Sequence, residues 1–142
     1  MKYDEFVERV QQTAELHSLE DATKVVEAVL KTLGERLTRG EREDLASQLP
    51  KELKDYLYKH RTPERSRLEY ELFSLEEFYN RVGARTKVRY KQAVKLSQVV
   101  GEVLREAVSP RELQDILSDL PEEFDELFGK KPESPLSPSA TA

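Results

Sequence analysis

The chain has 142 residues, a length typical of one domain or of two very small ones. Charged residues make up 36% and hydrophobic residues 37%, so we expect a modest core beneath a highly charged surface. The formal net charge of −5 disfavours general binding to nucleic acid, although a local basic face stays compatible with it. The absence of cysteine excludes disulfides, thiolate metal sites and cysteine nucleophiles.

The sequence gives no indication that the protein interacts with a membrane. No apolar run reaches the roughly 20 residues that a membrane-spanning helix needs. The first five residues lack the apolar core of a signal peptide. We therefore expect a cytoplasmic protein, a location with which the lack of cysteine is compatible.

The first half of the chain predicts four helices, near 4–15, 19–37, 39–48 and 50–58. Ser18 is placed to cap the second helix, and Thr38 with Glu41 forms a capping box at the start of the third. The second helix carries the longest apolar stripe, formed by Ala22, Val25, Val26, Val29, Leu30, Leu33 and Leu37.

The second half predicts the same succession, with helices near 75–86, 90–108, 110–119 and 121–128. Capping boxes mark two of these starts, one formed by Ser74 with Glu77 and the other by Ser109 with Glu112. No segment shows the alternation of apolar and polar residues that a half-buried strand requires. The sequence therefore predicts an all-α fold.

The two halves resemble each other in sequence, which indicates an internal duplication. Residues 4–10 match residues 76–82 at an offset of 72, and from Ala22 onward an offset of 71 holds. The matched residues are mostly apolar and helically spaced, so they describe shared packing rather than shared chemistry. Gly101 stands where the first half has Leu30; it either permits the close approach of another helix or reflects drift between the halves.

We expect one pseudo-symmetric helical domain over residues 1–128. Two diverged four-helix repeats, 3–58 and 74–128, would pack together through their long helices, because neither repeat alone buries much surface.

Residues 59–73 are expected to link the repeats and to lay Leu68, Leu72 and Phe73 onto the core. Residues 129–142 are expected to form a disordered tail, because their proline- and serine-rich composition cannot repay the entropy of ordering. This tail is either inert or a docking peptide centred on Pro135-Leu136-Ser137-Pro138.

Three segments carry a family resemblance: the Asp-Glu-Phe motif at 4–6, the helix end at 33–37, and the run 45–53 with its Leu-Pro step. Together they resemble an uncharacterised bacterial family of small, internally duplicated helical proteins, known only as a domain of unknown function. The likeness covers about residues 3–128 and implies the fold alone. It brings no activity, cofactor or catalytic residue, and this chain departs from the pattern in its basic segment at 81–95 and in its linker.

The search for catalytic groups is mostly negative. The only histidines are His17 and His60, and neither follows a glutamate three positions earlier, which argues against a di-iron carboxylate site. A phosphate-cradling glycine loop and a serine nucleophile elbow are absent. Carboxylates are abundant, but nothing singles out an acid–base pair. We therefore expect no catalytic residue, no metal and no cofactor, and a protein that is not an enzyme.

Charge patterning gives the one specific functional hint. From 81 to 95 the chain has six basic residues and no acid, and we take these as a candidate interaction face: Arg81, Arg85, Lys87, Arg89, Lys91 and Lys95. They either balance acids of the other repeat, or dock an acidic protein or a second copy of the chain, or bind nucleic acid or another polyanion. The preferred hypothesis is a non-catalytic interaction or scaffold module with an unknown protein partner or self-association. Binding of nucleic acid or another polyanion through 81–95 is the alternative.

Overall fold

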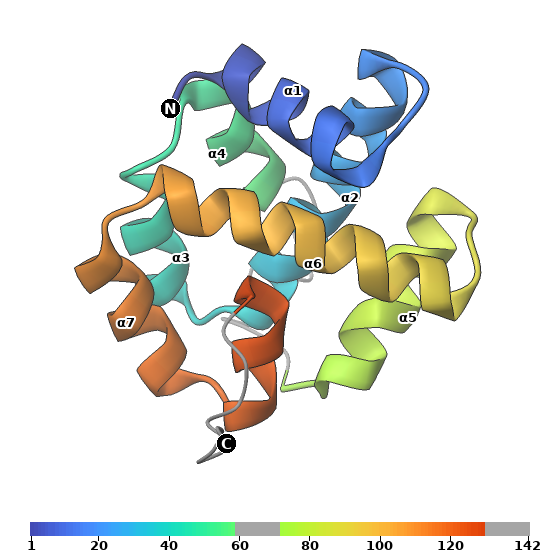
Figure 1. Ribbon diagram of the computed structural model, residues 1–142. Coiled ribbons are helices and arrows are strands. Elements are labelled where there is room, and N and C mark those ends of the chain that lie inside the picture. Colours follow the sequence, from blue (N-terminus) through green and yellow to red (C-terminus); the bar gives the residue numbers. More distant parts are fainter. Residues whose placement is uncertain (59–71, 130–142) are drawn as a thin grey trace, which may run out of the picture.

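The computed structural model describes residues 1–58 and 72–129, and within these ranges it contains helices and no strand. The all-α prediction is therefore confirmed. Figure 1 shows the elements in chain order: α1 (Tyr3–Ala14), α2 (Leu19–Arg36), α3 (Arg39–Ala46), α4 (Lys51–Tyr58), α5 (Leu75–Thr86), α6 (Tyr90–Ala107), α7 (Pro110–Asp119) and the 3₁₀ helix η2 (Glu122–Phe128).

The helices begin where the sequence places their caps. The Ser18 hydroxyl accepts from the backbone N–H of Asp21 at 3.1 Å, and Thr38 and Glu41 form the complete capping box. Ser74 and Ser109 also cap their helices through the hydroxyl. These local interactions explain why the predicted boundaries lie within two residues of the observed ones.

The last helix differs from the prediction, because η2 is a 3₁₀ helix rather than an α-helix. It spans seven residues, which is long for a 3₁₀ helix, since most such helices run for about three or four. It packs against α6. A Cβ placed on Gly101 would lie 1.8 Å from the carbonyl oxygen of Leu127, so this glycine does permit a close approach.

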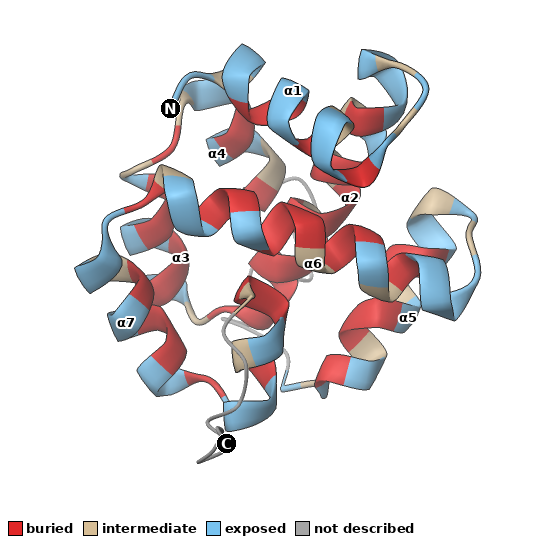
Figure 2. Cartoon of the chain, viewed as in Figure 1, coloured by how far each residue is buried: buried red, intermediate tan, exposed pale blue. Residues whose placement is uncertain are grey.

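The packing between the two halves is reciprocal. α1 lies against α2 and also against α6, while α5 lies against α6 and also against α2. The long helices α2 and α6 touch each other, and α3 touches α7. Figure 2 shows the buried positions as stripes along the helices, and these residues form one continuous apolar cluster.

The expected contacts of the linker are described only at its end. Leu72 is 75% exposed, so the prediction that it packs on the core is wrong. Its neighbour Phe73 does pack there, with its ring centroid 6.5 Å from that of Phe78. The predictions for 59–71, Leu68 included, and for the tail at 130–142 lie outside the described residues. Gly129 ends η2 with a φ of 76°, a conformation suited to glycine.

Candidate functional site

Two of the six predicted basic residues are paired with one buried carboxylate. Arg85 donates two hydrogen bonds to Glu35, at 2.6 and 3.0 Å, and Arg81 donates a third at 3.1 Å. The side chain of Glu35, on α2, is only 1% exposed, whereas both arginines belong to α5. For Arg81 and Arg85 the intramolecular interpretation therefore holds.

The surroundings of Glu35 favour its charged form. Burial alone would raise its pKa, but the guanidinium of Arg85, and then that of Arg81, outweigh burial and hold the pKa below its ordinary value. Arg85 also donates to the hydroxyl of Thr32 at 2.7 Å, and this hydroxyl donates to the carbonyl of Ala28 at 2.8 Å. Arg85 thus joins α5 to α2 through three hydrogen bonds, two to Glu35 and one to Thr32.

The other four basic residues are exposed. These four are Lys87, Arg89, Lys91 and Lys95. Within residues 1–58 and 72–129 their side chains form no hydrogen bond and no ion pair. Lys87 ends α5 with a φ of 60°, and Arg89 is the N-cap of α6. The structure therefore divides the predicted face into a structural pair and four cations available to a partner.

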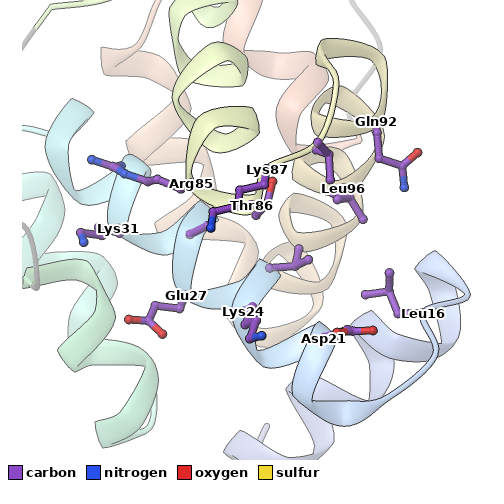
Figure 3. Close-up of a pocket in the computed structure, with 13 residues that line it drawn as sticks. Leu16, Asp21, Lys24, Glu27, Lys31, Arg85, Thr86, Lys87, Gln92 and Leu96 are labelled. Atoms are coloured by element: carbon purple, nitrogen blue, oxygen red, sulfur yellow. The ribbon is translucent and has the colours of Figure 1, made fainter.

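A groove of about 650 Å³ lies beside this basic segment. Its walls are α2, the turn from α5 to α6, the first turns of α6 and the turn from α1 to α2. Figure 3 shows residues from these elements facing one another across it. We call this feature the interhelical groove.

The interhelical groove combines an apolar floor with a basic rim. The floor is formed by nearly buried side chains of both halves, Val25, Ala28 and Leu96, and Leu16 and Val88 extend it. The rim carries Arg85 and three lysines, Lys24, Lys31 and Lys87. None of these lysines forms an ion pair among the described residues. Two acids, Asp21 and Glu27, also line the groove, as do Thr86 and Gln92.

The groove overlaps only partly with the predicted face. Arg85 and Lys87 line it, whereas Arg89, Lys91 and Lys95 do not. Sequence reasoning missed Lys24 and Lys31, because they belong to the other half of the chain. Their spacing of seven positions on one predicted helix was the available signal, since residues so spaced lie on the same helical face.

An equivalent ion pair in the other half was also missed. Arg9 lies 72 positions before Arg81, and Glu106 lies 71 positions after Glu35. These two side chains pair at 2.8 Å between α1 and α6, with 47% and 43% of each exposed. The signal was present, because both residues fall on the matched positions of the two halves.

The histidines contribute nothing to a site. His17 is exposed in the turn between α1 and α2, and His60 lies outside the described residues. In the described part of the chain, no group of three or more His, Asp or Glu side chains is arranged to hold a metal ion. Among the helices that the structure describes, none combines the length and the apolar character needed to cross a membrane.

The fold and the groove define a small all-helical domain with an apolar, basic-rimmed cleft between two sets of helices. Residues 3–127 match a family described as an uncharacterized conserved protein (DUF2267), and the chain belongs to that family. The family has no assigned function, in agreement with the resemblance noted from the sequence. No curated protein matches the chain.

Proposed function

We propose that this protein is a non-catalytic protein-interaction module that binds its partner in the interhelical groove. The observation that carries the proposal is the rim of three lysines around an apolar floor, with no ion pair to any of them among the described residues. Three lysines against the two acids Asp21 and Glu27 leave the lining with a positive charge, which attracts an anionic partner. Such a partner would also cover the floor.

We also infer that the two halves are diverged copies of one unit. Support comes from the reciprocal packing and from the equivalent ion pairs of Arg9 and Arg81. A third support is the backbone: Glu15 and Lys87, 72 positions apart, end α1 and α5 with φ angles of 56° and 60°. The groove lies where the copies differ in charge, because Lys87 replaces the acidic Glu15 and Arg85 replaces Thr13.

Charge reversal inside and outside the groove tests the proposal. The variant Lys24→Glu/Lys87→Glu alters the rim, whereas Lys91→Glu/Lys95→Glu changes the net charge equally at positions that do not line the groove. Each is compared with the wild type in quantitative capture from a native lysate, after equal thermal stability has been verified. We expect one or more proteins to be retained by the wild type and by the second variant, and lost from the first. Identical protein sets for the wild type and both variants would remove the proposal.

Polyanion binding through 81–95 is a second candidate function. It is favoured by the exposed Lys87, Arg89, Lys91 and Lys95 and by the absence of acids from the first turn of α6. A gel-shift series with duplex and single-stranded DNA separates it from the first, since phosphate contacts make affinity fall steeply with salt. The absence of any shift at low salt would eliminate it.

A cytoplasmic setting completes the proposal, supported by the lack of cysteine. Fractionation of cells expressing the tagged protein tests it, and recovery outside the cytoplasmic fraction would contradict it.

A further inference from the structure

The geometry points to the chemistry of the partner: we infer that the interhelical groove binds a short acidic peptide segment that places one bulky apolar side chain between two carboxylates. This inference rests on the proposed function, because it identifies what occupies the same site. It follows from the spacing of the rim lysines, the composition of the floor and the acids in the lining.

The rim sets the spacing of the carboxylates. Lys24 and Lys31 are seven positions apart on α2, which corresponds to a rise of about 10 Å along one face. Lys87 approaches from the opposite wall, as Figure 3 shows. A peptide in the extended polyproline II conformation advances about 3.1 Å per residue with three residues per turn, so acids three positions apart lie on one side, about 9 Å apart, and match the two lysines of α2. An extended segment with such acids therefore fits the rim.

The floor sets the apolar contact. Val25 and Ala28 lie between the two lysines in the sequence of α2, and Leu96 faces them from α6. Val88 and Leu16 are only partly buried, so their remaining apolar surface is available to a ligand. Covering apolar surface of this kind with a leucine side chain improves affinity by about tenfold or more.

The remaining lining disfavours a polyphosphate chain. Asp21 and Glu27 lie in the groove, and Glu35 is buried behind Arg85. A nucleic-acid or polyphosphate backbone carries a charge on every unit, so it would bring phosphates against these carboxylates. It also has no aliphatic side chain to place on the floor. A peptide can position its acids at the lysines alone.

Chemical-shift titration of the full chain tests the inference, because it detects weak binding. The probe is a capped peptide, Gly-Glu-Leu-Ser-Glu-Gly, and two control peptides replace either the leucine with serine or both glutamates with glutamine. We expect the probe to shift the backbone signals of Val25, Ala28 and Leu96. We expect about tenfold weaker binding for the serine peptide and loss of binding for the glutamine peptide.

The protein variants provide the matched controls. Lys24→Glu/Lys87→Glu should abolish the shifts, while Lys91→Glu/Lys95→Glu should preserve them. The inference is overturned if the probe causes no shifts at millimolar concentration, if the serine peptide binds as well as the probe, or if inorganic polyphosphate binds the groove more tightly.

These outcomes are separable from failure of the proposed function. If the groove variant still loses a partner from the lysate but the probe peptides do not bind, the module stands and only the acidic-segment inference fails. If the lysate partners are independent of the groove, the proposed function itself fails.

Discussion

At the scale of single residues, Glu35 is the carboxylate that fastens α5 to α2. It accepts hydrogen bonds from Arg81 and Arg85 while almost fully buried. Removing this carboxylate leaves Arg85 without its ion-pair partner, whereas Arg81 keeps Glu77 at 2.9 Å. The loss of a buried ion-pair partner costs more than the loss of an exposed one.

The substitution Glu35→Gln is therefore expected to lower the free energy of unfolding by about 3 kcal/mol near neutral pH. The folded-state pKa of Glu35 is held below its ordinary value of 4.5, so its charge stabilises the fold above that pH. This stabilisation is lost as the pH falls from about 4.5 through the folded-state pKa. Urea unfolding from pH 7 downward should show the difference between wild type and variant shrinking below about pH 4.5.

The equivalent Glu106→Gln is the control. Glu106 pairs with Arg9 while 43% exposed, so its loss should cost less than about 1 kcal/mol. Equal effects at the two positions would contradict the role given to burial.

Glu15 and Lys87 hold an unfavourable backbone conformation. With φ angles of 56° and 60°, each places a Cβ where only glycine is free of steric cost. Glu15→Gly and Lys87→Gly are each expected to raise the free energy of unfolding by about 1 kcal/mol in thermal or urea denaturation. Ala84→Gly in α5 should instead lower the free energy of unfolding by about 1 kcal/mol. Destabilisation by all three would show that the strain is absent.

At the scale of elements, η2 depends on α6 and α5 for its position. The hydroxyl of Tyr79, whose pKa is raised by burial, donates to Glu126 at 2.9 Å, and Gln98 donates to the same carboxylate at 3.1 Å. The backbone N–H of Leu75 donates to Glu123 at 3.1 Å. These bonds and the approach to Gly101 explain how this 3₁₀ helix keeps a fixed place.

Gly101→Ala tests that approach. Helix propensity alone predicts stabilisation by about 1 kcal/mol. The added Cβ, however, would collide with the Leu127 carbonyl, so we expect net destabilisation of about 1–3 kcal/mol and faster amide exchange in η2. Gly40→Ala, where a Cβ meets nothing within 4 Å, should be neutral or stabilising. A stabilised Gly101→Ala would show that η2 does not rest against this glycine.

The helices could be predicted from the sequence because the caps and apolar stripes that define them involve residues close together in the chain. Ser18, Thr38 and Ser74 cap helices through neighbours in the chain, and each apolar stripe lies within one helix. The 3₁₀ geometry of η2 and the exposure of Leu72 depend on packing between distant segments, which periodicity does not reveal. The pairing of Glu35 and the groove beside Lys24 could not be predicted for the same reason, because both residues meet the basic segment only after folding.

At the scale of the whole molecule, each half covers its long helix with the first helix of the other. α1 packs on α6 and α5 packs on α2, so neither half buries its own apolar surface completely. The core is accordingly one continuous cluster rather than two.

The two halves are therefore expected to fold only together. Separate peptides spanning 1–58 and 72–129 should each lack a cooperative thermal transition by circular dichroism, because small units bury too little surface. An equimolar mixture should regain helicity and a single transition. A cooperative transition in either peptide alone would contradict the interdependence of the halves.

Reciprocal packing also bears on how the groove arose. If the halves derive from one unit, that unit would have met a second copy of itself through an isologous interface, in which every substitution appears twice. Fusion into one polypeptide releases that constraint. The second half can then carry Arg85 and Lys87 while the first half carries Thr13 and Glu15 at the matching positions. In this way a symmetric ancestor would acquire a basic groove on one side of the molecule only.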